Sequence, residues 1–200
     1  MQIGTQLYPY SDVAEARKQT PTTAKAINVQ VGPGDVISNI PIFTLFEHHQ
    51  VHEGEAYQVC YPPASLANGS TLNFRIVVGN QTPTTKTPHM ICEIDSTGES
   101  WGALYENPTT TGNGNQMTAN NRNRNSSNSP VTTIWAAPTV TNVGTLLTAC
   151  IIGSGERAGG NGRESIEWDL AANTVYIAQV TAKNANNVCL RFQWYEDLGV

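Results

Sequence analysis

The chain has few charged residues. Asp, Glu, Lys and Arg make up only 14% of its 200 residues, and 16 acidic against 11 basic side chains give a formal net charge of -5. Such a chain has no overall positive field to hold a phosphate backbone by displacing its counterions. We therefore expect no nucleic-acid partner.

Long apolar runs are also lacking. No window approaches the roughly 18 uninterrupted apolar residues of a membrane helix. The N-terminus, MQIGTQLYPYSDVAEARKQ, lacks the apolar core of a secretion signal. We expect a soluble protein that has no membrane partner and is made in the cytoplasm.

The cysteines do not form closely spaced pairs. The four are Cys60, Cys92, Cys150 and Cys189. Zinc sites and redox motifs need close pairs, so neither is expected here. We interpret the four as buried free thiols in a reducing compartment, with disulfides as the alternative.

Several common catalytic motifs are missing too. The sequence contains no HExxH, no phosphate-binding loop and no dinucleotide fingerprint. A glycosidase would need two carboxylates across a cleft. The candidates are Glu53, Glu164, Glu167 and Asp169. Alternation places Glu167 and Asp169 on the solvent face, opposite Trp168 and Leu170. We expect no enzyme and no cofactor.

Period-two patterns are abundant. In STLNFRIVV, the apolar positions Leu72, Phe74, Ile76 and Val78 share one face, as in a half-buried strand. The pattern also predicts strands over residues 174–182 and 188–195. We expect these two strands to form a hairpin in which AKNANN supplies the turn. Further short strands follow at roughly ten-residue spacing. Residues 26–200 are therefore predicted to form an all-β, jelly-roll-like β-sandwich.

Residues 1–25 differ from the rest in composition. They allow one short helix over residues 14–18, which Pro21 would stop. The segment is too short and polar to form its own core. It is either a flexible tail or an extended N-terminal arm that docks on a neighbouring subunit through Leu7, Tyr8 and Tyr10.

Three of the four histidines lie in EHHQVHEGE, residues 47–55. On a strand, His48 and His52 would share a face roughly 13 Å apart, with His49 on the other face. One metal ion would then need a bend in the backbone or ligands from several subunits. We favour hydrogen-bonded histidines in a partner contact over a metal site.

Residues 107–130 are almost free of apolar side chains and must form a surface loop. Arg122 and Arg124 in this loop are either solvated or donors to carboxylates of a partner.

The tryptophans divide into two pairs. Trp168 and Trp194 share faces with aliphatic residues and are expected in the core. Trp101 and Trp135 are less constrained, which leaves a glycan-binding module as an alternative function.

Several segments together resemble one protein family. These are EHHQVHEGEAY, LANGSTLNFRIVV, TTTGNGNQMTANNRNRNSSNSP, PTVTNVGTLLTACIIGSG and ESIEWDLAANTVYIAQVTAKNANNVCLRFQWYED. Their order resembles that of capsid decoration or structural virion proteins of tailed bacteriophages. The resemblance covers roughly residues 45–197.

This resemblance implies a small all-β protein on the outer surface of the capsid. Such a protein would be assembled in the host cytoplasm, commonly as a homotrimer, and would bridge neighbouring major capsid proteins. A tail or head-fibre protein and a glycan-binding, host-recognition module are the alternatives. A glycan hydrolase would be a third.

Overall fold

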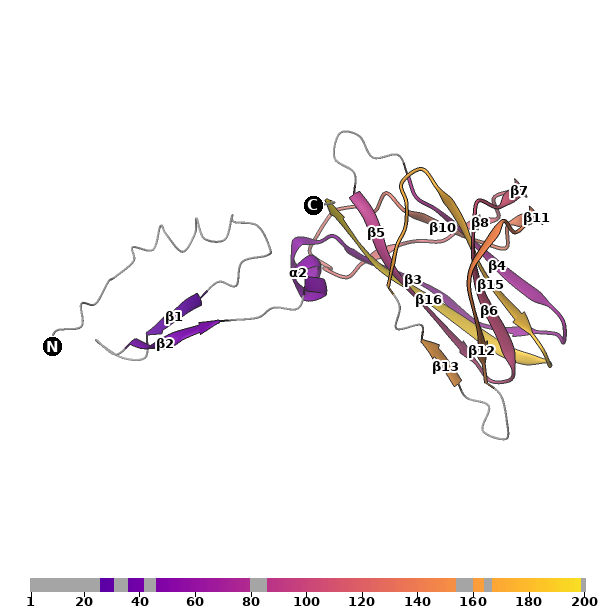
Figure 1. Cartoon of the computed structure of the whole chain (residues 1–200), viewed down its shortest axis with the longest axis horizontal. Coiled ribbons are helices and arrows are strands. Elements are labelled where there is room, and N and C mark those ends of the chain that lie inside the picture. The colour runs from indigo at the N-terminus through magenta and orange to yellow at the C-terminus, as the bar shows by residue number, and fades with distance from the viewer. Residues whose placement is uncertain are drawn as a thin grey trace. The chain divides into compact units, whose positions relative to one another are not determined.

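The computed structural model describes residues 26–30, 36–41, 46–79, 86–153, 160–163 and 167–198 (Figure 1). The chain divides into two compact units, Met1–His49 and Gln50–Val200. In the first unit, β1 (Ala26–Gln30) and β2 (Val36–Pro41) pair antiparallel in a sheet of their own. The expected arm, residues 1–25 with Leu7, Tyr8 and Tyr10, lies outside the described residues.

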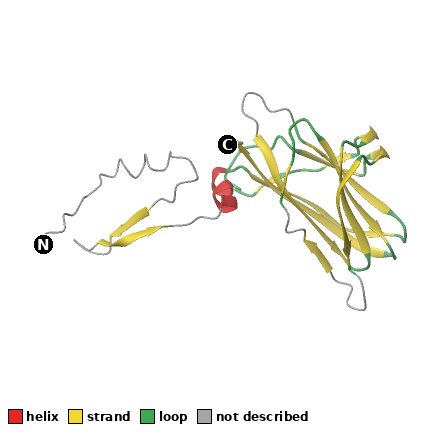
Figure 2. Cartoon of the chain, in the orientation of Figure 1, coloured by secondary structure: helices red, strands yellow, loops and turns green. Residues whose placement is uncertain are grey.

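The second unit consists mainly of two antiparallel sheets (Figure 2). The first sheet has the order β12 (Thr145–Ile152), β6 (Ser100–Glu106), β15 (Val175–Ala182), β4 (Thr71–Val77), β10 (Thr133–Ala136) and β8 (Asn115–Gln116). The second has the order β13 (Gly160–Arg163), β5 (Lys86–Ser96), β16 (Asn186–Leu198), β3 (Ala56–Leu66) and β9 (Asn120–Asn121), and β14 (Trp168–Asp169) also pairs with β5.

The strand order is that of a jelly roll. In the second sheet, β3, β16 and β5 lie side by side, and β13 and β14 both pair with β5. In the first sheet, the corresponding order is β4, β15, β6 and β12. Strands that follow one another in the chain therefore mostly lie in opposite sheets, as two Greek keys require. The predicted all-β sandwich of jelly-roll type is confirmed.

The core lies between the two sheets. Its members come from alternate positions of each strand, and the largest fully buried side chains include Tyr57, Phe74, Ile76, Ile134, Leu190 and Phe192. The predicted inward face of β4 is confirmed by this set. Trp194 is buried and Trp168 packs against the core, as expected.

The predicted hairpin of β15 and β16 is wrong. Strand β15 pairs with β4 and β6, whereas β16 pairs with β3 and β5. Both strands bury one face in the same interior, but they do so from opposite sheets. Residues 183–185 therefore carry the chain across the sandwich, which a turn signal alone does not distinguish from a hairpin.

The strand geometry that we considered for the histidine segment does not apply. Residues 46–53 form the helix α2 (Phe46–Glu53). It ends in a Schellman motif, because the amide of Glu55 donates to the carbonyl of Gln50 at 3.0 Å and that of Gly54 to Val51 at 3.1 Å. Gly54 has a φ of +76°, which is the left-handed conformation that this helix ending needs.

The cysteines are free thiols, as expected, but they are not all buried. Cys60 is exposed, and Cys92, Cys150 and Cys189 are half-buried. Cys60 lies on the outer face of β3 because the inward positions are Val59 and Tyr61.

A long insertion separates β6 from β12. Within it, β7 (Thr109–Gly112) and β11 (Thr139–Asn142) form a two-stranded ribbon, while β8, β9 and β10 extend the two main sheets. Residues 107–130 are exposed or half-buried, in agreement with their composition. They do not form a single loop, however, because β7, β8 and β9 lie within them and Met117 and Ala119 pack against the core. No helix in the described part of the chain could cross a membrane.

Candidate functional site

Two segments predicted to contact partners meet on the surface of the sandwich unit. The side-chain amide of Asn121 donates from Nδ2 to the carbonyl of Gly54 at 2.7 Å, and the side-chain amide of Asn123 donates from Nδ2 to the carbonyl of His52 at 3.1 Å. Asn128 donates to a carboxylate oxygen of Glu55 at 3.1 Å. We call residues 52–55 and 121–128 the junction surface. It brings the end of the histidine segment beside the arginine loop.

The two arginines of this loop are exposed. The backbone amide of Arg122 is fixed to the carbonyl of Ala56 at 2.8 Å, and the guanidinium of Arg124 donates to the carbonyl of Asn121 at 3.4 Å. The loop also comes very close to Gly54, where a Cβ atom would lie 2.3 Å from Oγ of Ser126. Hydrogen bonds and close packing therefore hold the loop on the end of α2.

His48, His49 and His52 are all exposed on α2. The strand spacing that separated His48 from His52 does not apply in a helix, where residues four apart share a face. Among the residues that the structure describes, no group of three or more His, Cys, Asp or Glu side chains is arranged to hold a metal ion.

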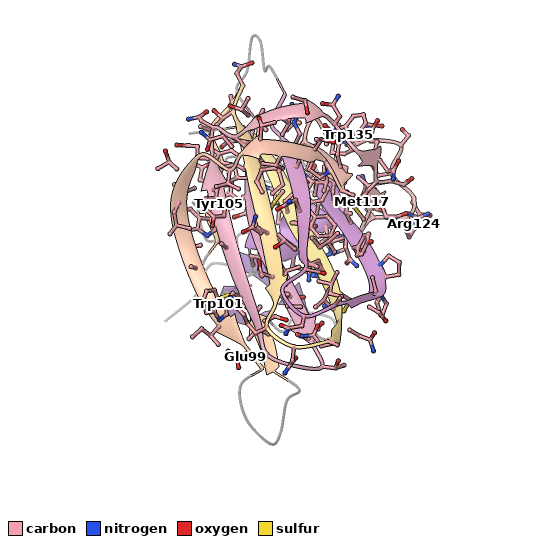
Figure 3. All side chains as sticks on the ribbon, turned by 90° about the vertical axis from the view of Figure 1, so that its right-hand side faces the viewer. Glu99, Trp101, Tyr105, Met117, Arg124 and Trp135 are labelled. Carbon is pink, nitrogen blue, oxygen red and sulfur yellow. The ribbon has the colours of Figure 1, made fainter. Side chains whose placement is uncertain are left out.

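A second surface lies on the outer face of the first sheet. Strands β12, β6 and β15 present a shallow depression of about 370 Å³, which we call the trough. Figure 3 looks onto this face, with Trp101 and Tyr105 on β6 and Trp135 farther across the sheet.

Cross-strand register determines the shape of the trough. Ile151 lies opposite Trp101 at one end, and Leu146 lies opposite Tyr105 at the other. Between these bulky pairs, Ala149 lies opposite Ala103. The two short alanine side chains therefore form the floor of the trough, and the bulky pairs border it at both ends.

The side of the trough on β15 is polar. Thr181 lies opposite Trp101, and Gln179 lies opposite Ala103. Gln179 Nε2 donates to Oδ1 of Asn73 on the neighbouring strand at 2.8 Å, which fixes the orientation of its amide. The trough thus has an apolar side on β12 and an amide and a hydroxyl on β15.

Lys183 fixes the tryptophan of the trough. Its Nζ lies 3.1 Å from the centroid of the Trp101 ring, an ammonium–aromatic contact. Lys183 is not among the residues that line the trough. Trp101 is nevertheless 50% exposed.

The outer face of the second sheet carries the carboxylate that we considered for catalysis. Glu167 is exposed, as predicted, and Oε1 contacts Nδ1 of His89 at 2.8 Å and the hydroxyl of Tyr195. The rings of His89 and Tyr195 stack with centroids 4.8 Å apart. Asp169 is exposed as well. These contacts link β5, β14 and β16 across the sheet.

Burial changes the ionisation of some groups in this fold. Desolvation, and secondly the charges of Glu55 and Glu196, raise the pKa of the Tyr57 hydroxyl well above its ordinary value. Desolvation and the neighbouring Asp95 raise the pKa of Cys189, so its thiol stays protonated at neutral pH.

Sequence reasoning found only part of the trough. It identified Trp101 as a tryptophan outside the core, and this is confirmed. It missed Tyr105, Leu146 and Ile151. The available signal was TLLTACII, residues 145–152, which is apolar at neighbouring positions and therefore on both faces of its strand.

Comparison with known proteins does not identify a relative. The chain matches no family model, no curated protein and no solved structure.

Proposed function

We propose that this chain is a non-enzymatic structural protein of a tailed-phage virion. In this proposal it binds the outer surface of the capsid as a homotrimer and stabilises the shell by bridging neighbouring major capsid proteins. It would be assembled in the host cytoplasm. The order of sequence segments from EHHQVHEGEAY to the C-terminal strands supports this assignment.

The observation that carries the proposal is the construction of the junction surface. Three asparagine side chains, those of Asn121, Asn123 and Asn128, form hydrogen bonds to residues 52–55. These residues lie near the start of the sandwich unit, which follows the first 49 residues of the chain. An ordered polar loop loses less conformational entropy on binding than a flexible one. The exposed Arg122 and Arg124 on this loop can donate to carboxylates of a capsid subunit.

A structural role also suits the jelly-roll sandwich. Many weak contacts repeated by symmetry give high avidity without strong single-site affinity. The chain would add bonds across the boundaries between capsid subunits and resist the outward pressure of packaged DNA. This role needs no turnover and no cofactor.

The direct test is co-sedimentation of the purified protein with expanded capsids that lack it, with unexpanded shells as the comparison. We expect saturable binding to expanded shells and greater heat resistance of those shells. Absence of binding to either shell would refute the proposal and favour a tail or fibre location.

Charge-neutral variants make the test specific. Arg122→Gln with Arg124→Gln should weaken binding, because both guanidinium donors are removed from the junction surface. The matched control is Lys183→Gln with Arg191→Gln, which removes the same charge from other parts of the surface. Equal losses in both double variants would mean that net charge, not the junction surface, determines binding.

A further inference from the structure

The exposed large apolar side chains of the described residues gather in one place. They are Trp101, Leu146 and Ile151, which are 50%, 53% and 66% exposed, and all three line the trough. Single exposed apolar residues are ordinary on a protein surface, whereas a cluster around a depression indicates a binding site. The volume of about 370 Å³ lies within the roughly 300–1,000 Å³ typical of ligand pockets.

The shape of the trough suits a flat ring. Its floor is made by Ala103 and Ala149, and two aromatic side chains, Trp101 and Tyr105, stand four residues apart on β6. That spacing corresponds to roughly 13 Å along a strand. The contact with Lys183 holds the Trp101 ring in place, so little side-chain freedom is lost when a ligand packs against it.

The chemistry of the trough suits a ligand with hydroxyl groups. Gln179 and Thr181 lie beside the aromatic residues, and the hydrogen bond from Gln179 to Asn73 leaves the amide in a defined orientation. Thr181 is within 3.0 Å of the hydroxyl of Thr71, which extends the polar edge. Among the described residues that line the trough, none carries a charge.

We propose that the trough binds a neutral oligosaccharide. The apolar C–H face of a sugar ring would pack on Trp101, and its hydroxyl groups would bond to Gln179 and Thr181. A wholly apolar protein partner would bury the remaining hydrogen-bonding capacity of that amide and hydroxyl without satisfying it, which is costly. This inference goes beyond the proposed capsid role and does not depend on it.

The test is binding of a defined panel of neutral hexasaccharides: maltohexaose, cellohexaose, xylohexaose, mannohexaose and chitohexaose. Titration calorimetry with the full chain at millimolar sugar measures affinity, and tryptophan fluorescence reports on the site. We expect at least one sugar to bind and the affinity to be insensitive to salt, because the lining is uncharged. Failure of all five sugars to bind would overturn the inference.

Variants locate the binding. Trp101→Ala should lower the affinity about tenfold or more, in line with the loss of an aromatic packing surface. Gln179→Leu should also lower it, because the amide is removed at similar volume. Trp135→Ala, on the same sheet face but outside the trough, and Gln58→Leu, on the other sheet, are the matched controls and should bind normally.

Two results would contradict the assignment. One is sugar binding that survives Trp101→Ala with unchanged affinity. The other is a change of oligomeric state in Trp101→Ala, measured by analytical ultracentrifugation without any sugar binding by the natural chain, because it would mean that a second copy covers the trough. Neither result bears on capsid binding through the junction surface, so the two proposals fail separately.

Discussion

The indole Nε1 of Trp194 donates to Oε1 of Glu196 at 3.1 Å, and both side chains are almost completely buried. The same carboxylate accepts hydrogen bonds from the backbone amides of Val131 and Thr132 at 2.9 Å. A buried carboxylate is tolerated only when it is hydrogen-bonded in this way. Glu196 therefore anchors the part of the long insertion that directly precedes β10 to the central strand of the second sheet.

Replacement of this carboxylate should destabilise the fold. Glu196→Ala leaves three buried donors without an acceptor, and we expect a loss of about 3 kcal/mol or more in the free energy of unfolding. Urea unfolding at neutral pH measures the loss. Asp169→Asn, the loss of an exposed carboxylate, is the control and should change stability by less than about 0.5 kcal/mol. Equal effects would show that Glu196 is not an anchor.

Stability should fall at alkaline pH. The raised pKa of Tyr57 means that the folded protein keeps this hydroxyl protonated while the unfolded chain ionises near its ordinary pKa of about 10. The contribution of the Tyr57 hydroxyl to the free energy of unfolding is fully present below about pH 10. It is lost as the pH rises from there toward the raised pKa of Tyr57 in the folded protein. Melting temperatures measured between about pH 8 and 11 should decline less steeply for Tyr57→Phe. An identical slope in both proteins would contradict the assignment.

The end of α2 should not tolerate a side chain. Gly54→Ala would place a Cβ 2.3 Å from Ser126 Oγ in a residue with φ of +76°, so we expect it to displace the loop over 121–128. Hydrogen exchange of this loop should increase. Gly69→Ala is the matched control, because its φ is +75° and nothing lies within 4 Å. It should cost only the conformational strain, about 1–2 kcal/mol, and leave the exchange of the loop unchanged.

Replacement of an asparagine of the junction surface should reduce the order of the loop over 121–128 more than it reduces the stability of the whole fold. Asn121→Ala removes the hydrogen bond to the carbonyl of Gly54 and should cost about 1 kcal/mol. Limited proteolysis at Arg122 or Arg124 should become faster while the melting temperature changes little. Asn115→Ala, an exposed asparagine elsewhere in the insertion, should leave the cleavage rate unchanged.

Removal of residues 1–20 tests the expected arm. The truncated chain should remain folded, because the sandwich core lies wholly in residues 57–194. It should no longer co-sediment with expanded capsids. Normal capsid binding by the truncated chain would rule out the arm, with Leu7, Tyr8 and Tyr10, as the attachment segment.

The strands could be predicted because their signal is local. In β4, the side chains of Phe74 and Ile76 alternate with those of Asn73 and Arg75, and that pattern alone identifies the buried face. The helix α2 lacked such a signal, since its eight residues carry almost no apolar periodicity. The glycine after Glu53 was the available indication of a helix end.

The candidate sites depend on distant pairings and could not be predicted in the same way. The trough exists because Ile151 and Thr181 flank Trp101 from two different strands. The junction surface joins Asn121 to Gly54, which are 67 residues apart in the sequence. Neither register nor strand order can be read from periodicity. Of the trough, only Trp101 could therefore be identified beforehand, and for the junction surface the two segments could be identified but not their meeting.

The strand order also has a consequence for synthesis of the protein. Strands β3 and β5 do not pair with each other, because β16 lies between them. The ribosome makes β3 and β5 long before β16, so both remain without their shared neighbour until residues 186–198 have emerged. The second sheet can therefore close only after nearly all of the sandwich has been translated. During that interval the unpaired strands are exposed to aggregation and are natural sites for chaperone binding.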